Sequence, residues 1–547
     1  MTSKCIRRIG YGVGVLALAV ALFYAEEDWR GHKAWQQFKQ QSEASGERFE
    51  LAIPLTVPDD QNFALAPIVA SAYETYIDEH GNRLPSFTNS SSNRLGIALY
   101  YTNDFQHIWS YDRDEGPTNL SNWRLAKFTD LAAWQKYYRN PPPNVTAASR
   151  AFRGSRMGSV PKIQTVTATN PFPVNPQPQS PAADVLLALS RYDSVLEELR
   201  QASKLPGVRF AFRYDPEYPS FKILFPGIGA FAQCAQILSL RADAELAEGR
   251  SDKALQDIQL VLRLAQMQTG TVWPRRDGIM FVNVALQAAW EGMAAHHWSD
   301  AQLVALDSEL SKLDFLAEYH REVRGHRAYS WDEINCIRVW SRNGPWFPKT
   351  DDNGFNEPEP IGQLLAKACY CLAPSGWWNQ NRLASARAYQ QALSQIDPDK
   401  RVVSKDRARP FSIIEDRSDT PHPTRMLAQA TYDAVPAEKF AYAQTEVDLA
   451  RVACALERYR IASGDYPSSL DQLVPRFMPQ LPHDVIDGAP LRYRNEGHGQ
   501  ILLYSIGWDG IDDRGRVMHG YRGGSGIDIT LGDWVWRYHN DQAGTPH

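Results

Sequence analysis

Apolar residues form one long unbroken run near the N-terminus, from Ile9 to Ala25. A run of about 17 residues is at the lower limit for a helix that crosses the hydrocarbon of a bilayer. Lys4, Arg7 and Arg8 precede the run. Because basic flanks stay in the cytoplasm, the bulk of the chain is expected outside it. The pattern predicts a single-pass signal anchor in the inner membrane over residues 1–28.

A cleaved signal peptide is the alternative reading of the same segment. Ala19–Ala21 offers a small-residue cleavage site, but the apolar run continues beyond it through Leu22, Phe23 and Tyr24. The longer run favours a retained anchor over a removed signal. From Trp29 to about residue 41 the polar, aromatic-dotted sequence is expected to continue the helix away from the membrane.

Helical periodicity dominates the middle of the chain, from Ala182 to Leu316. Two stripes on either side of Gly249 predict an antiparallel helix pair, which resembles one tetratricopeptide-type hairpin. No repeated period marks a solenoid. Ser299 with Gln302 three residues later is the pattern of a capping box. The stripes of the pair comprise Phe231, Cys234, Ala235, Leu238, Ala242 and Leu246, and then Ala254, Leu255, Ile258, Val261, Leu262 and Ala265.

Shifts in composition divide the rest of the chain. Residues 29–140 mix short apolar runs with turns, and 141–181 form a Pro/Ser/Thr-rich linker. The helical domain is assigned to 182–396, with an aromatic, irregular stretch expected at 330–378 and a helix at 379–396. Residues 397–430 are charged and contain prolines, which predicts a second linker. A C-terminal domain follows at 431–547.

The C-terminal domain begins with an expected amphipathic helix from Ala437, which Gly464 stops in a left-handed conformation. Ser468 is the predicted cap of a short helix, with Asp471 three residues on and Pro475 at its end. An antiparallel hairpin is expected over residues 491–506. A loop rich in glycine and aspartate follows the hairpin.

This order resembles the C-terminal half of the major pseudopilin of type II secretion systems, over about the last hundred residues. The resemblance implies a small α+β head and a place near a secretion or pilus-like apparatus. The segments that carry it are Ala455–Arg460, Gly464–Pro467, Ser469–Leu473, Leu503–Gly510, and Asp528–Ile529 with Gly532–Trp534. The sequence departs from this family in two ways. Pseudopilins carry Glu at the fifth position after the leader glycine, but the fifth position after Gly10 is Val15. The pseudopilin membrane helix also runs straight into the head, whereas about 400 residues separate them here. A borrowed head domain is therefore expected, and not a filament subunit.

The aspartate loop is the candidate metal site, with Asp509, Asp512, Asp513 and Asp528 as ligands. Calcium prefers six to eight oxygen ligands, and glycines let a short loop wrap an ion. The resembling pseudopilins hold calcium in the matching loop. The alternative is a loop whose aspartates cap local backbone N–H groups. Nearby Arg514 adds positive charge, which lowers affinity for a cation.

Composition narrows the function further. The net charge is −5 and no long basic run is present, so nucleic acid is not an expected partner. Among six cysteines, Cys369 and Cys371 lack the second pair of a zinc site. Adjacent His296 and His297 point about 100° apart on a helix, which favours a helix-end or surface role over chelation. Neither a nucleophile elbow nor a phosphate-binding loop is found.

The sequence thus predicts a mainly α protein with a small α+β C-terminal domain and an N-terminal membrane helix. Its expected function is non-enzymatic: a membrane-anchored, extracytoplasmic structural or interaction protein of the bacterial envelope. Its expected partners are the lipid bilayer, through Ile9–Ala25, and envelope proteins. Two alternatives stay open: an exported hydrolase with a site in the aromatic 330–380 region, and a helical-repeat scaffold that binds a peptide.

Overall fold

The computed structural model describes residues 3–49, 56–71, 74–77, 83–86, 121–140, 170, 172–210, 228–268, 277–343, 369–404, 427–428, 431, 434–519 and 527–539. Among these residues the chain is mainly helical, with a few small antiparallel sheets, as the sequence predicts. Most of the predicted 141–181 linker and of the 397–430 linker lies outside the described residues.

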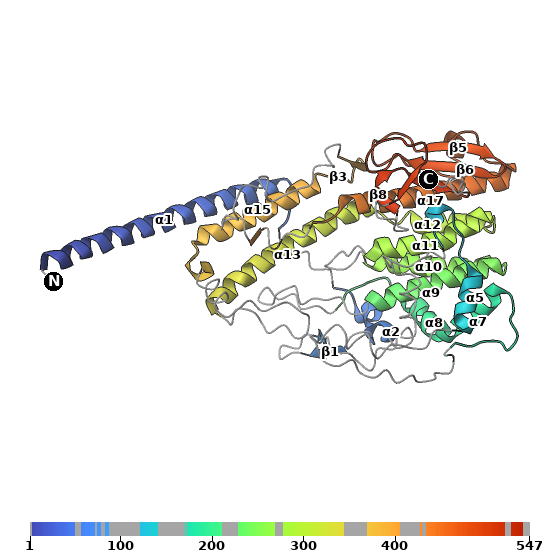
Figure 1. The fold of residues 1–547 in the computed structure, drawn as a ribbon, viewed down its shortest axis with the longest axis horizontal. Helices are drawn as coiled ribbons and strands as arrows, with labels where there is room; N and C mark the ends of the chain where they lie inside the picture. Colours follow the sequence, from blue (N-terminus) through green and yellow to red (C-terminus); the bar gives the residue numbers. More distant parts are fainter. Residues whose placement is uncertain are drawn as a thin grey trace.

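Helix α1 (Ser3–Ala44) projects from the body as a single uninterrupted rod (Figure 1). Its first part is long and apolar enough to cross a membrane and is not buried inside the rest of the described chain. The second part packs beside α15 (Ser375–Leu393). Trp35 lies against Leu383 and Ala386 in a small apolar cluster there. The helix expected to continue beyond Trp29 is therefore confirmed.

Helices α9 (Ile228–Ala247) and α10 (Ser251–Gln268) form the predicted antiparallel pair. Gly249 has a φ of +73°, in the left-handed region where glycine is favoured. Helices α11 (Asp277–Ala294) and α12 (Asp300–Leu310) follow and pack on the pair. The capping box is confirmed, since the Ser299 hydroxyl accepts from the Gln302 N–H at 3.4 Å and the Gln302 side chain accepts from the Ser299 N–H at 2.9 Å.

The described parts of the stretch 330–378, residues 330–343 and 369–378, are mainly helical, which differs from the expectation of irregular structure. Helix α13 (Phe315–Asn343) runs through Ser330 and Trp331, and α15 begins at Ser375, four residues earlier than predicted. The sequence pattern misled because aromatic and polar residues interrupt the apolar stripe. Trp331 stacks on Phe49 with ring centroids 5.0 Å apart, so an aromatic contact adds to the buried aliphatic residues of α13, such as Val323 and Ile334.

Helix α17 (Ala437–Ser463) lies between the helical block and the head and packs against both. The expected amphipathic helix is instead buried nearly all round from Phe440 to Glu457. The polar residues on it are paired across the two halves, as with Gln444, which accepts from the Phe315 N–H at 2.8 Å. Gly464 ends the helix at φ +86°, which confirms the predicted left-handed stop.

The head holds a sheet in the order β5-β6-β9, made of β5 (Arg492–Gly497), β6 (Gln500–Ser505) and β9 (Trp534–Arg537). The hairpin β5–β6 is the predicted one, in antiparallel register with Tyr493 opposite Leu503. Strands β7 (Val517–His519) and β8 (Ile527–Gly532) pair separately. Ser469, and not Ser468, caps the short helix at Leu470–Leu473, a 3-10 turn, by accepting from the Asp471 N–H at 3.3 Å.

Shorter elements complete the described chain. They are η1 (Asp59–Gln61), η2 (Phe63–Leu65), α2 (Pro67–Ala70), β1 (Glu74–Ile77), β2 (Arg83–Ser86), η4 (Trp123–Leu125), α5 (Leu131–Arg139), α7 (Pro181–Leu189), η5 (Ser190–Tyr192), α8 (Asp193–Ala202), η7 (Leu470–Leu473), β3 (Ile396–Asp397) and β4 (Val402–Val403). One core cluster extends from α7 through α17 to β9, so head and helical block share a common interior.

Candidate functional site

The aspartate loop joins β6 to β7 at the edge of the head. Its start is fixed by a close approach of two glycines: a Cβ on Gly507 would come within 1.9 Å of the Gly532 carbonyl oxygen. Gly507 also has a φ of +69°, so no other residue fits there without strain. This contact places the loop beside the end of β8. The predicted ligands of the loop and of β8 are thus brought to one end of the head.

The predicted ligands accept local backbone hydrogen bonds in the folded chain. Asp509 accepts from the N–H groups of Ile511 and Gly532, both at 3.0 Å. Asp512 accepts from the Tyr504 hydroxyl at 3.2 Å and the Arg514 N–H at 2.9 Å. This is the capping role that the sequence left open as the alternative.

Asp528 is held within its own strand, where it accepts from the Thr530 N–H at 2.9 Å and the Thr530 hydroxyl at 2.6 Å. Across the described part of the chain, no three His, Cys, Asp or Glu side chains gather in a group that could hold a metal ion. The four predicted ligands form no such group in this conformation. Calcium binding stays a prediction.

Asp533 organises the loop, although the sequence analysis did not single it out. Its side chain is 2% exposed and accepts from the N–H groups of Asp513, Gly515 and Arg516, at 3.3, 2.6 and 3.3 Å. Burial raises the pKa of the Asp533 carboxyl to about 6 against the opposing effect of these donors. The signal in the sequence was its position between a glycine and the apolar Trp534.

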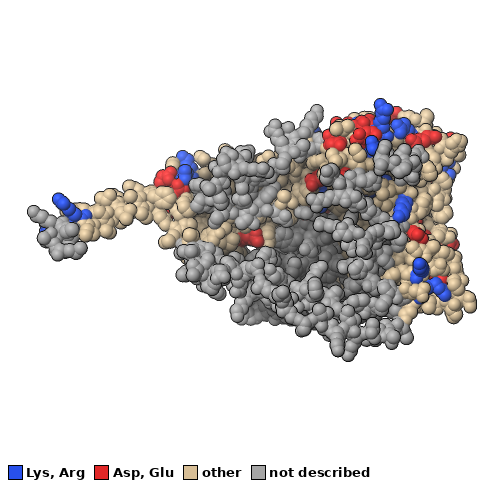
Figure 2. All heavy atoms as spheres, in the orientation of Figure 1, with Lys and Arg blue, Asp and Glu red and all other residues tan. Residues whose placement is uncertain are grey.

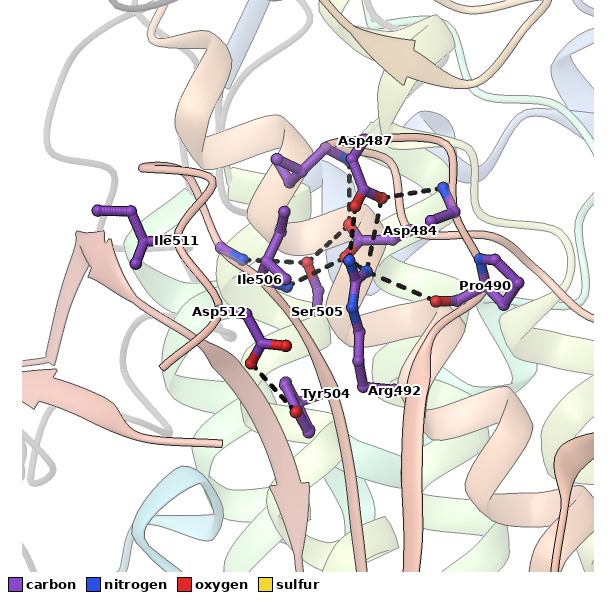
Figure 3. Close-up of polar contacts among 12 residues, drawn as sticks. Asp484, Asp487, Pro490, Arg492, Tyr504, Ser505, Ile506, Ile511 and Asp512 are labelled. Carbon is purple, nitrogen blue, oxygen red and sulfur yellow. Dashed lines mark hydrogen bonds and ion pairs between the residues drawn. The ribbon is translucent and has the colours of Figure 1, made fainter. Parts of the chain in front are cut away.

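A second buried aspartate fixes the segment before β5. Asp484 is 0% exposed and accepts from the Ser505 hydroxyl at 2.8 Å and the Ile506 N–H at 3.0 Å. Arg492 reaches from β5 between Asp484, at 2.7 Å, and Asp487, at 2.5 Å (Figure 3). The paired charges and hydrogen bonds offset the cost of burying a carboxylate. Asp512 and Tyr504 lie apart from this group, toward the loop.

A third polar cluster lies where the segment around η4 enters the body. The Thr129 hydroxyl lies 2.7 Å from Asp243 and 2.6 Å from Glu291, and both carboxyl groups are buried. Glu291 also accepts from the Thr129 N–H and from Gln287, each at 2.7 Å. One hydroxyl hydrogen serves one carboxylate, so the arrangement is satisfied when Asp243 is protonated and donates to Thr129.

The electrostatics of this cluster agree with a shared proton. Burial raises the pKa of both carboxyls, and the charge of Glu291 raises that of Asp243 further. Gln287 accepts from the Trp123 N–H at 2.8 Å, so the same helix also holds η4. The cluster binds the segment 122–130 to α9 and α11. A sequence signal existed: Asp243 and Glu291 interrupt otherwise apolar helix faces.

His296 has a role that the sequence did not define. It lies at the end of α11 with φ +56°, and its Nδ1 is 3.1 Å from Glu457 of α17. Glu457 also accepts from Arg460 at 3.0 Å and from the Tyr466 hydroxyl. The pair therefore links the helical block to the head rather than chelating an ion with His297.

The junction between α1 and the body is the other candidate site. The projecting part of α1 is tan over most of its length, and a charged band marks where it joins the body (Figure 2). In that band Glu27 accepts from the Trp377 indole at 3.0 Å, and the Gly376 N–H donates to Asp28 at 2.8 Å. Hydrogen bonds with Arg30 help lower the pKa of Glu27. Trp377 of α15 thus serves packing against α1.

Comparison with models of known protein families, with curated proteins and with solved structures finds no match to this chain. The fold and the contacts described above therefore carry the functional argument by themselves. The class they define is a mainly helical protein with a projecting apolar N-terminal helix and a small antiparallel C-terminal head.

Proposed function

We propose that this protein is a single-pass protein of the bacterial inner membrane that acts by assembly with other envelope proteins and not by catalysis. The N-terminus would be cytoplasmic and the body extracytoplasmic. The observation that carries the proposal is the continuity of α1. Its apolar part, Ile9–Ala25, is not buried inside the rest of the described chain, and its polar part is packed into the body.

This continuity has a mechanical consequence. Gly31 of α1 and Gly376 of α15 approach so closely that neither tolerates a side chain, and Trp35 lies under Trp331 with ring centroids 4.6 Å apart. A helix held this way transmits its direction to the body, unlike a Gly/Ser-rich linker. The protein would therefore present its head at a fixed distance and orientation from the bilayer.

The head is the part proposed to meet a partner. The resemblance of its sequence to pseudopilin heads supports a place beside a type II secretion or pilus-like apparatus. Described exposed apolar side chains on the head include Ile511 at the aspartate loop and Leu531 on β8. A photo-crosslinking residue at Ile511 should trap a component of that apparatus in cells. The matched position Val304 on α12, also exposed, should not; equal trapping at both sites would contradict the assignment.

Membrane location is tested first. Full-length protein should remain in the membrane pellet after alkaline extraction, and its body should be digested by protease in spheroplasts but not in intact cells. A variant that lacks residues 2–25 should be soluble. Recovery of the full-length protein from the cytosol would end the proposal.

Calcium at the aspartate loop is a separate proposal. It requires Asp509 and Asp512 to exchange their backbone donors for the ion, with Asp513 and Asp528 completing the set. A ligand that binds only the folded chain raises the melting temperature. We expect calcium to raise it in the wild type and not in Asp513→Asn, with magnesium as the control ion. If calcium did not shift the melting temperature of the wild type, the calcium proposal would be wrong.

A helical-repeat scaffold is supported by one specific observation. Helices α9, α10 and α11 pack on one another and α12 packs on α10, so the helical stack is larger than the one predicted pair. However, α17 packs against α11 and α12, so the stack is closed by the chain itself on that side. A peptide would need another face of the stack.

A further inference from the structure

Helix α1 lies beside α15 and the segment that leads into it. The Tyr24 hydroxyl donates to the Leu372 carbonyl, and Asp28 accepts from the Gly376 N–H. Further along both helices, Trp35 lies in one cluster with Leu383. The residue numbers rise together in these contacts, so α1 and α15 run in the same direction.

The contact between Tyr24 and Leu372 fixes how deep this segment reaches. Tyr24 is within the apolar run Ile9–Ala25, and its hydroxyl bonds the Leu372 carbonyl. Side chains on a helix lean toward its N-terminus, so the Tyr24 hydroxyl points away from the charged band at residues 26–28. Leu372 therefore lies beyond the charged band, toward the N-terminal end of α1.

The chemistry of the segment suits lipid. Cys369, Tyr370, Cys371 and Leu372 form one helical turn without a charged side chain, and Leu372 is 68% exposed. The charged band at residues 26–28 is flanked by the aromatic residues Tyr24, Trp29 and Trp377. Trp29 is 63% exposed. Aromatic residues of this kind are enriched where hydrocarbon meets headgroups. A helical turn also satisfies part of its backbone internally, as hydrocarbon demands.

We propose that the turn 369–372 dips into the outer edge of the bilayer beside α1. The body would then touch the membrane through two elements, and the second contact would fix its rotation about α1. The occupant is lipid because the turn is continuous with the apolar surface of α1, which the bilayer would already cover. This inference rests on the proposed membrane anchoring.

Site-directed spin labelling tests the depth of the turn in the intact protein. The full chain is reconstituted into vesicles of phosphatidylcholine and phosphatidylglycerol after replacing Cys5 and Cys369 by serine. Cys234, Cys336 and Cys454 are buried and shielded from the label. A nitroxide on Cys371 should collide often with oxygen and rarely with a water-soluble nickel chelate.

Two reference labels in the Cys371→Ser background set the scale: Leu22→Cys within the apolar run and Ile511→Cys on the head. The Cys371 label should match the Leu22 position and differ from Ile511. Collision with nickel equal to that at Ile511, with Leu22 still in lipid, would overturn the second contact alone. Nickel access at Leu22 as well would overturn the anchor. A Cys371 label shielded from both reagents would mean a protein cover and would also overturn the proposal.

Substitution gives an independent readout. Leu372→Glu places a charge in the turn, and charged residues are expelled from hydrocarbon. It should raise nickel collision at Cys371 without releasing the protein from the vesicles. Leu531→Glu, a change at an exposed position on the head, should leave the Cys371 label unchanged; an unchanged label in Leu372→Glu would contradict the inference.

Discussion

Gly31 and Gly376 touch backbone to backbone where α1 crosses α15: a Cβ on Gly31 would lie 2.2 Å from the Gly376 carbonyl oxygen. The reciprocal contact is closer still, because a Cβ on Gly376 would lie 1.9 Å from the Glu27 carbonyl oxygen. Only glycine at both positions lets the helices approach this far. The crossing sits directly after the apolar run and so couples the anchor to the body.

The first prediction concerns this crossing. Gly376→Ala should destabilise the packing of α1 on α15 by about 1–3 kcal/mol, the usual cost of overpacking. Limited proteolysis between residues 45 and 60 should then become faster. Gly12→Ala is the matched control, since nothing lies within 4 Å of its added Cβ. Equal proteolysis of the two variants would mean that the close approach of Gly31 and Gly376 does not hold α1 on α15.

The second prediction uses Glu47, which follows α1 and accepts from Arg324 and Arg327, each at 2.8 Å. Burial raises the pKa of Glu47, but the two guanidinium groups outweigh it and lower the pKa to about 2. Glu47→Gln leaves Arg327, which is 0% exposed, without a counter-charge. The expected loss is about 3–5 kcal/mol in denaturant unfolding.

The direction of the Glu47 pKa shift determines how the ion pairs with Arg324 and Arg327 depend on pH. Because the folded pKa is below the unfolded value, the stabilisation is present above about pH 4.5 and is lost as the pH falls toward 2. The difference in unfolding free energy between wild type and Glu47→Gln should therefore shrink on acidification. Glu43→Gln, an exposed neighbour whose carboxylate is 3.5 Å from Lys39, should change little at any pH.

The elements that the sequence predicted are those with local signals. The long apolar N-terminal helix, the α9–α10 pair, the capping box at Ser299 and the β5–β6 hairpin depend on periodicity and turn residues close together in the chain. Ser469 was missed by one position because Ser468 offers the same hydroxyl. Local chemistry thus specifies the element better than its boundary.

The contacts between distant segments could not be predicted in this way. Thr129 meets Asp243 and Glu291 across more than a hundred residues, and Asp533 closes a loop that begins near residue 509. Nothing near Asp243 in the chain indicates its partners. Helix α17 was expected to be amphipathic because its polar residues looked solvated. They are instead paired with residues of other elements, such as Arg401 with Asp448 at 3.3 Å.

The third prediction tests the shared proton of Asp243 and Glu291. Thr129→Val is nearly isosteric and removes the only hydroxyl between the two carboxyls. The loss should be about 1–3 kcal/mol, the cost of leaving a buried polar group unsatisfied. Val195→Thr makes the opposite exchange at a half-buried position on α8, which carries neither carboxyl. It controls for the exchange of a methyl group and a hydroxyl and should change stability less. A neutral Thr129→Val would show that the bridge contributes nothing.

The same pair predicts a pH effect of opposite sign to that of Glu47. Its folded pKa values are raised, so above about pH 4 the unfolded chain releases protons that the folded pair retains. The pair's contribution to unfolding free energy therefore falls as the pH rises. Asp243→Asn carries its hydrogen at every pH, so its stability should decline less than that of the wild type between pH 5 and 8. Parallel declines would contradict a retained proton.

The last prediction concerns Asp533, whose carboxylate accepts three backbone N–H groups of the aspartate loop. Asn offers one oxygen and turns an N–H₂ group toward the remaining donors. Asp533→Asn should therefore speed hydrogen exchange at the Gly515 and Arg516 amides and lower stability, since hydrogen bonds to a charged group contribute about 1.5–3 kcal/mol. Asp528→Asn removes a carboxylate that bonds only Thr530 in the described chain, so exchange at Gly515 should be unaffected. If both variants exchange at the wild-type rate, the loop is shaped by its glycines, Gly507 and Gly532, and not by the buried acid.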